Sequence, residues 1–192
     1  GHEWAVTLLQ NAVTARQQAH AYLFTGVAHI GRYTLAQALA RALNCTAGQS
    51  PCAARVDSGA WKVKEGCRAC RLIAAGAHPD VEVLSPEGAS LKIDQVRQLQ
   101  HDVALLPVEA RWRVAIIDGM EAATAEASNA LLKTLEEPPS HVVLVLIASE
   151  AGLLLPTIVS RCQHLPLRPL AIGRVQDALM THWHVETQRA NE

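Results

Sequence analysis

The sequence predicts an α/β fold in which one parallel sheet carries helices on both of its faces. Segments with strand patterns alternate with segments with helix patterns along the 192-residue chain, as in other parallel α/β proteins. The strand segments are apolar throughout, which is typical of strands that a parallel sheet buries on both faces. A glycine-containing loop also joins the first strand segment to the helix after it. We expect ligands at the carboxyl ends of the strands, because open sheets of this class bind them there.

Apolar periodicity and turn residues predict each element of the first half of the chain. Val6, Leu9 and Val13 are spaced as on one face of a helix over residues 3–18. The run "AYLFTG" predicts a buried strand, and the alanine- and leucine-rich "YTLAQALARALNC" predicts a helix. Residues 46–66 are rich in Gly, Ser, Pro and Ala, so we expect them to leave the core.

The second half of the chain continues the alternation of strands and helices. "DVEVLSP" predicts a strand, and "IDQVRQLQHDVAL" predicts a helix with Asp94 as its N-cap. "RWRVAIIDG" and "HVVLVLIASE" predict two further strands on either side of the helix "TAEASNALLKTLEE", which Thr124 caps and two prolines end. A short helix or turn is expected over residues 156–161, and "VQDALMTHW" predicts the start of a further helix.

Composition and charge exclude some classes of protein. The chain holds 17 basic and 18 acidic residues, a net charge of −1, whereas dedicated nucleic-acid binders carry a basic excess. A contact with DNA that is shared with other chains stays open, because composition averages over all faces. No apolar run reaches the roughly 18 residues of a membrane span, and the N-terminus lacks the pattern of a secretory signal. We therefore expect a cytoplasmic protein.

The loop "GVAHIGRYT" keeps the spacing of a phosphate-binding loop but changes its chemistry. Gly26 and Gly31 match the template, which continues with Lys and then Ser or Thr. Arg32 replaces the lysine that reaches the phosphates, and Tyr33 replaces the hydroxyl that binds Mg²⁺. Thr34 stands one position late, and one residue is a rotation of about 100° on a helix. We expect the loop not to support ATP hydrolysis; a plain strand-to-helix turn is the alternative interpretation.

A second position that an ATPase needs also departs from the pattern. Asp118 ends a strand, where it could lie near Mg²⁺, but Gly119 follows it instead of a glutamate, and Glu121 comes two positions later. A turn-forming Asp-Gly pair explains Asp118 as well. Gly26, Asp118 and Ser149 all end strand segments, so we expect them at one edge of the sheet.

Four cysteines indicate a structural metal site in the segment outside the core. Cys45, Cys52, Cys67 and Cys70 lie close in sequence, and the last two have the spacing of a zinc knuckle. Four thiolates would leave no position for water, so the zinc would be structural and not catalytic. Disulfides and a redox-active Cys-x-x-Cys pair are the alternatives. We favour zinc, because disulfides rarely persist in the cytoplasm.

Several motifs together resemble the clamp-loader branch of the AAA+ ATPases. The triplet Ser160-Arg161-Cys162 follows a strand and a short helix downstream of the altered loop, and "NALLKTLEEPP" precedes it. "AHAYLFTG", "HPDVEVL" and "LKIDQVRQLQ" agree as well. The likeness therefore covers nearly the whole chain.

The resemblance implies a division of the chain into two parts. Residues 1–169 would form the AAA+ domain, with a zinc module inserted at about residues 45–70. Residues 170–192 would begin a helical lid domain that is truncated here. The C-terminal oligomerisation domain of this branch would then be absent from the sequence.

The resemblance also implies a function that acts on another subunit. Within this branch the chain is most similar to the bacterial subunit whose own phosphate loop is degraded. By position, Arg161 would be an arginine finger that reaches the ATP site of a neighbour, and Ser149 a polar sensing residue. The implied partners are the gamma/tau and delta subunits of a five-membered ring and, through it, the sliding clamp and primer-template DNA. An active gamma/tau-type ATPase, with Arg32 and Glu121 as substitutes, and a protein-binding module without a finger are the alternatives.

Overall fold

The computed structural model describes residues 2–47, 52, 66–169 and 173. Its centre is a five-stranded sheet, in the order β2-β3-β4-β1-β5, in which every neighbouring pair of strands is parallel. The strands are β1 (Ala21–Thr25), β2 (Val81–Leu84), β3 (Arg113–Asp118), β4 (Val142–Ala148) and β5 (Gln163–Pro166). The sheet confirms the predicted parallel α/β architecture. Every residue of β1 and β4 is buried, which explains why the sequence of these strands is apolar without alternation.

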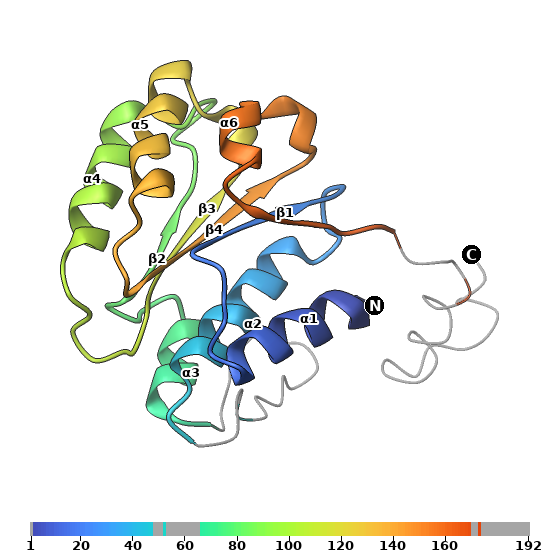
Figure 1. The fold of residues 1–192 in the computed structure, drawn as a ribbon, viewed down its shortest axis with the longest axis vertical. Coiled ribbons are helices and arrows are strands. Elements are labelled where there is room, and N and C mark those ends of the chain that lie inside the picture. Colours follow the sequence, from blue (N-terminus) through green and yellow to red (C-terminus); the bar gives the residue numbers. More distant parts are fainter. Residues whose placement is uncertain (1, 48–51, 53–65, 170–172, 174–192) are drawn as a thin grey trace.

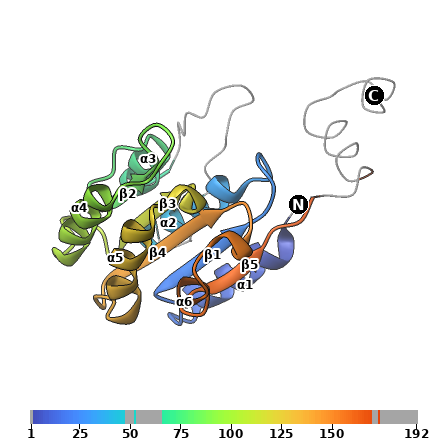
Figure 2. The ribbon, with the colours of Figure 1, turned by 90° about the horizontal axis from the view of Figure 1, so that it is seen from above.

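Helices cover both faces of the sheet, as Figures 1 and 2 show. One face carries α1, α2 and α3, and the opposite face carries α4, α5 and α6 (Figure 1). Their bounds are α1 (Glu3–Thr14), α2 (Arg32–Asn44), α3 (Arg68–Ala74), α4 (Ile93–Ala104), α5 (Ala125–Glu136) and α6 (Pro156–Val159). The sheet therefore lies between two layers of helices, as the sequence predicts.

The sheet separates two hydrophobic cores, because successive strand side chains point to opposite faces. In β1, Tyr22 and Phe24 pack with α1 and α2, whereas Leu23 packs with α4 and α5. In β3, Ile116 and Ile117 divide in the same way. Each core is thus closed by helices on one side and by the sheet on the other, and the loops at the strand ends stay at the surface.

Two expected helix boundaries are wrong. The first helix ends at Thr14 instead of residue 18, because Arg16 adopts a left-handed conformation with φ of 56°. Helix α4 begins at Ile93 after the N-cap residue Lys92, so Asp94 lies in the first turn and is not the N-cap. The Gln95 Oε1 atom accepts a hydrogen bond from the Lys92 N–H at 3.0 Å, so a side chain of the first turn satisfies the backbone N–H of the N-cap residue.

Two elements are present that the sequence did not predict. Strand β5 is an edge strand in which only Leu165 is buried, so its sequence has no apolar run. Helix α3 starts directly after Cys67, so its first turn contains Cys70, the second cysteine of the expected zinc knuckle. The further helix expected in "VQDALMTHW" lies outside the described residues, and so do residues 48–51 and 53–65 of the expected zinc module. No helix in the described part of the chain has the length and apolar character that a membrane crossing requires.

Candidate functional site

The carboxyl ends of β1, β3 and β4 bring the predicted loop residues to one edge of the sheet. Strand β3 ends at Asp118, which pairs with Ile147 of β4. The Gly26 N–H, directly after β1, donates a hydrogen bond to the Ser149 carbonyl at 3.0 Å. The expectation that Gly26, Asp118 and Ser149 share one edge is therefore confirmed.

The first loop glycine has a packing reason that is independent of any ligand. A Cβ atom at Gly26, whose φ is 148°, would lie 2.5 Å from the Leu167 carbonyl oxygen. Leu167 passes close by because its N–H donates to the Thr25 carbonyl at 2.7 Å. Gly31, the N-cap of α2, has φ of 99° and needs glycine for its left-handed backbone alone. Both glycines thus keep the strand-to-helix turn of a phosphate loop.

The three side chains that follow the loop, Arg32, Tyr33 and Thr34, lie in different environments. The Tyr33 ring packs against the core between α1, α2 and the sheet. Its hydroxyl accepts a hydrogen bond from Gln37 Nε2 at 3.3 Å, one turn further along α2. Arg32 Nη1 is buried and has no hydrogen-bond partner among the described residues. Thr34 is exposed on the helix.

The acidic residue that could replace a catalytic glutamate is engaged by the backbone. Glu121 lies in a 3₁₀ helix, Met120–Ala122, directly after the turn that follows β3. Its Oε1 atom accepts a hydrogen bond from the Ser149 N–H at 3.1 Å. From the sequence, Glu121 is a candidate to replace the missing glutamate. In the structure its carboxylate is instead hydrogen-bonded to the backbone after β4, which joins the loops that follow β3 and β4.

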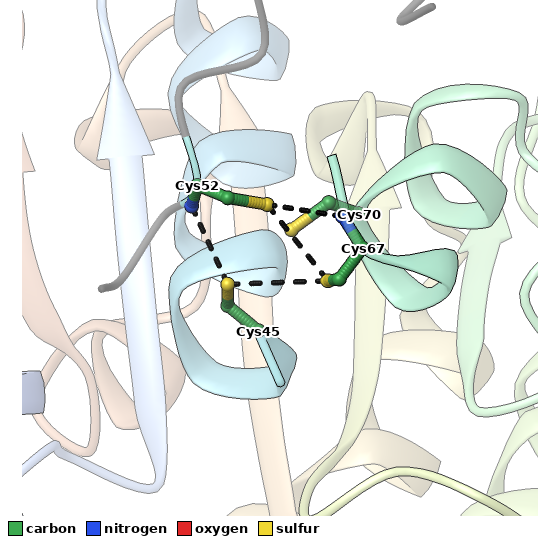
Figure 3. Close-up of side chains that lie close together, drawn as sticks. All are labelled: Cys45, Cys52, Cys67 and Cys70. Carbon is green, nitrogen blue, oxygen red and sulfur yellow. Dashed lines mark hydrogen bonds between the residues drawn. The ribbon is translucent and has the colours of Figure 1, made fainter. Parts of the chain in front are cut away.

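The four predicted metal-binding cysteines come together at the ends of two helices (Figure 3). Cys45 follows α2, Cys67 precedes α3, and Cys70 lies within α3. Their Sγ atoms, with that of Cys52, all lie within 4.8 Å of one another. The Cys67 Sγ atom is 3.8 Å from Cys52 Sγ and 3.9 Å from Cys45 Sγ.

These distances fit metal coordination better than disulfides. Four sulfurs at about 2.3 Å from one tetrahedral zinc ion lie about 3.8 Å apart, whereas a disulfide joins two sulfurs at about 2.05 Å. All four thiols are free. The Cys52 N–H lies 3.3 Å from Cys45 Sγ, and the Cys67 N–H lies 3.4 Å from Cys52 Sγ, so backbone N–H groups donate to two of the sulfurs. The four cysteines could therefore hold a metal ion.

The thiols of the cluster differ in acidity. Burial would raise the pKa of the Cys67 thiol, but hydrogen bonds from the Cys70 backbone and from Thr46 outweigh it and lower that pKa to about 5. Burial, together with the neighbouring thiols, raises the pKa of Cys70. A metal ion would overcome the second effect, because coordination releases the thiol protons.

Arg161 stands at the surface directly after α6, where two groups hold its guanidinium. Nη2 lies 2.8 Å from Glu136 Oε1 at the end of α5. Nη1 donates to the Thr157 carbonyl at 2.9 Å. The side chain remains 35% exposed. The sequence motif gave Arg161 as a candidate but gave no sign of its pairing with Glu136.

The residues beside Arg161 have separate structural roles. The Ser160 hydroxyl donates to the Thr157 carbonyl at 3.1 Å and closes the turn after α6. Cys162 packs against the core formed with α4 and α5, and burial raises the pKa of its thiol to about 12. Ser160 and Cys162 thus hold the turn and the packing on either side of Arg161.

A buried ionic cluster near α3 is a feature that the sequence did not predict. The Asp80 carboxylate, 1% exposed, accepts hydrogen bonds from the N–H groups of Val108, Glu109 and Ala110 at 2.7–2.9 Å. Arg113 Nη2 lies 3.4 Å away. Burial opposes ionisation, but the three N–H donors and Arg113 outweigh it and lower the pKa of Asp80. The cluster fixes the loop between α4 and β3, and its interactions are structural.

The fold and the strand-end loop define the class of protein, an AAA+-type α/β domain. A solved structure with a similar fold is a DNA polymerase III, gamma subunit-related protein from Thermotoga maritima. The TM-score is 0.65 at 22% sequence identity, over 90% of this chain and 49% of that chain. At this identity the likeness concerns the fold alone.

Sequence comparison then gives the family. A profile of the family described as "DNA polymerase III, delta subunit" matches residues 1–171, and the chain belongs to this family. The DNA polymerase III subunit delta' of Bacillus subtilis is 37% identical over 174 residues, which are 90% of this chain and 49% of that protein. The subunit delta' of Pseudomonas aeruginosa is 42% identical over 163 residues, 84% of this chain and 47% of that protein. The chain thus spans about half the length of these relatives, and the resemblance found in the sequence is confirmed.

Proposed function

We propose that the protein is a clamp-loader subunit of the delta-prime type, which does not hydrolyse ATP and serves the ATP site of a neighbouring subunit. Family membership supports the clamp-loader part of the proposal. The observation that carries the rest is a contrast between two side chains. Tyr33, where an ATPase needs a small hydroxyl, packs against the core and is hydrogen-bonded to Gln37, whereas the Arg161 side chain lies at the surface and remains 35% exposed.

The strand-end loop supports a subunit without ATPase activity of its own. Binding of Mg²⁺ would need a small hydroxyl side chain at position 33. Tyr33 has a large ring there instead, and its hydroxyl accepts a hydrogen bond from Gln37. The carboxylate that would activate water is also missing, since Glu121 accepts the Ser149 N–H. The backbone turn of Gly26 and Gly31 is retained, and its N–H groups are those that bind phosphate in a phosphate loop. Because Arg32 and Tyr33 replace the lysine and the hydroxyl, we expect any binding of nucleotide there to be weak and unproductive.

Arg161 is the residue that we expect to take part in ATP hydrolysis, at the site of a neighbouring subunit. A guanidinium placed against a transferred γ-phosphate stabilises the charge that develops on it. For GTPases an arginine supplied in trans raises the rate roughly 10³- to 10⁵-fold, or about 4–7 kcal/mol. We infer that Arg161 acts in this way on a gamma/tau subunit, within a five-membered ring that also holds a delta subunit.

The remaining parts of the proposal concern the metal and the partners. Zinc at Cys45, Cys52, Cys67 and Cys70 joins the ends of α2 and α3 and acts structurally. Through the ring, the subunit helps to load the sliding clamp onto primer-template DNA. The division into an AAA+ domain over residues 1–169 and a lid beginning at residue 170 belongs to the same proposal.

The test is ATP hydrolysis by a clamp loader reconstituted with the full-length protein. If all gamma/tau copies lack their own arginine finger, the site completed by Arg161 is the one that keeps a finger. Arg161→Ala should then lower DNA-stimulated hydrolysis by about 10³-fold, while assembly of the ring is unchanged. An unchanged rate would reject the finger and favour a protein-binding module.

The second candidate, an active gamma/tau-type ATPase, makes a different prediction. In that case the full-length protein alone would turn over ATP, and Glu121→Gln would abolish the activity. Our proposal expects no turnover above background from the protein alone, with or without this substitution.

A further inference from the structure

The contact between Arg161 and Glu136 joins two elements that are far apart in sequence. Glu136 is the last residue of α5, and Arg161 follows α6. Their side chains meet at 2.8 Å, between Nη2 and Oε1. The second anchor, the Thr157 carbonyl, comes from α6 and binds Nη1 at 2.9 Å. The guanidinium is thus held at both terminal nitrogens, by two different helices.

The negative charge of Glu136, at the C-terminal end of α5, destabilises this helix unless a cation lies nearby. A carboxylate in the last turn of a helix faces the negative end of the helix dipole. Glu137 follows directly, so two negative charges gather at this end. Within the described part of the chain, Arg161 is the cation that pairs with Glu136, and the Glu137 side chain has no such partner. Lys133 is the basic residue of the last turn of α5, and Arg161 adds a second positive charge in direct contact with Glu136.

The two anchors leave the guanidinium available for a second molecule. An arginine side chain has five N–H donors, and the two contacts take up one on each terminal nitrogen. Three donors remain, on a side chain that is still 35% exposed. A long side chain held in one rotamer loses less conformational freedom when it then binds a phosphate.

We propose that Glu136 is a positioning residue, which holds the Arg161 guanidinium ready for the phosphate of a nucleotide bound to the neighbouring subunit. The inference rests on the arginine-finger role proposed above. Glu136 touches neither nucleotide nor water in this scheme and acts through Arg161. Because exposed ion pairs contribute little to folding stability, its removal should affect the reaction and leave the fold intact.

The experiment uses the reconstituted loader in which the gamma/tau copies lack their own fingers. Glu136→Ala should lower kcat for ATP three- to tenfold and leave KM within twofold, because the positioned charge acts mainly in the transition state. Glu136→Gln keeps an oxygen acceptor and should retain at least half of the wild-type rate. Glu137→Ala is the matched control, one residue away and unpaired, and should leave kcat unchanged.

A double substitution separates positioning from a general structural effect. In the Arg161→Ala background, Glu136→Ala should cause no further loss, since its effect passes through the missing arginine. Losses that multiply, or a melting temperature lowered by more than about 3 °C, would overturn the inference in favour of a structural role.

The outcomes also separate this inference from the proposed function. If Arg161→Ala leaves hydrolysis unchanged, the finger itself is wrong. If Arg161→Ala lowers the rate but Glu136→Ala leaves it unchanged or raises it, the finger stands and the positioning role of Glu136 is overturned. A raised rate would mean that Glu136 holds Arg161 back.

Discussion

The Ser149 N–H donates a hydrogen bond to Glu121 Oε1 at 3.1 Å, and this bond ties the loop after β3 to the end of β4. Both ends lie at the edge of the sheet where Gly26 also hydrogen-bonds to the Ser149 carbonyl. Ser149 therefore links three segments of this edge through its backbone. A role of Glu121 in fixing the edge needs no nucleotide.

Glu121→Ala should lower the free energy of unfolding by about 1 kcal/mol, because the Ser149 N–H loses its charged acceptor at a solvent-exposed site. Urea denaturation of the purified protein measures this change. Glu137→Ala, an exposed glutamate whose side chain makes no such bond in the described residues, is the control and should change stability by less than about 0.5 kcal/mol. Equal effects of the two substitutions would show that the bond contributes nothing.

The cysteine cluster predicts one tightly bound metal ion for each chain. Elemental analysis of protein purified without chelator should find about one zinc, and Cys70→Ser should lose most of it, because the fourth thiolate is removed. Cys162→Ala is the control, since this fifth cysteine packs against the hydrophobic core on the other face of the sheet, and the zinc content should persist. Zinc retained in full by the Cys70→Ser variant would contradict a four-thiolate site.

Removal of the metal should destabilise the protein in a pH-dependent way. Free zinc at about 100 times its Kd adds about 2.7 kcal/mol to the free energy of unfolding. Falling pH protonates the thiolates and releases zinc, so the stabilisation is present at neutral pH and is lost on acidification. Thermal unfolding with and without a chelator, at several pH values, checks this. A difference that stays constant down to pH 4 would point away from thiolate ligands.

The buried Asp80 carboxylate should contribute strongly to folding stability, although it lies far from the strand-end loop. Asp80→Asn should lower the free energy of unfolding by about 3 kcal/mol, because three N–H donors and buried Arg113 lose their anion. Asp94→Asn, whose side chain is 88% exposed, is the control and should be nearly neutral. Urea denaturation of both variants at pH 7 gives the comparison.

The pH dependence of this effect follows from the direction of the pKa shift. The pKa of Asp80 is lowered in the folded protein, whereas an unfolded aspartate titrates near 3.9 (roughly the model-peptide value). The ionised carboxylate therefore stabilises the fold fully above about pH 4, and the stabilisation is lost as pH falls through the lower folded pKa. The difference between wild type and Asp80→Asn should shrink below pH 4, and a difference that grows there would contradict the assignment.

The sequence was informative where a residue's environment follows from its neighbours in the chain. Apolar runs located β1, β3 and β4 because central strands are buried along both faces. The same rule missed β5, an edge strand with Gln163 and His164 exposed. The cysteine spacing located the cluster of four thiols that could hold a metal ion, since a short-range pattern sets most of its geometry.

Contacts between distant segments could not be read in this way. Glu136 looked like a helix-ending residue before two prolines, and its pairing with Arg161 depends on how α5 packs against α6. Asp80 similarly depends on a loop that follows α4. The motif around Arg161 indicated a candidate residue, but its ion pair with Glu136 became visible only with the packing of the helices.

Arg16 predicts a substitution that stabilises the protein. It follows α1 with φ of 56°, and the Gln17 N–H donates to the Ala12 carbonyl at 2.9 Å, a helix end at which glycine is favoured. Arg16→Gly should raise the free energy of unfolding by about 0.5–1 kcal/mol, because glycine adopts this conformation without steric strain. Gln17→Gly is the control. Because the backbone of Gln17 is not in the left-handed region, glycine relieves no strain there and should destabilise the protein. If both substitutions destabilise equally, the arginine side chain stabilises this turn by contacts that outweigh its backbone strain.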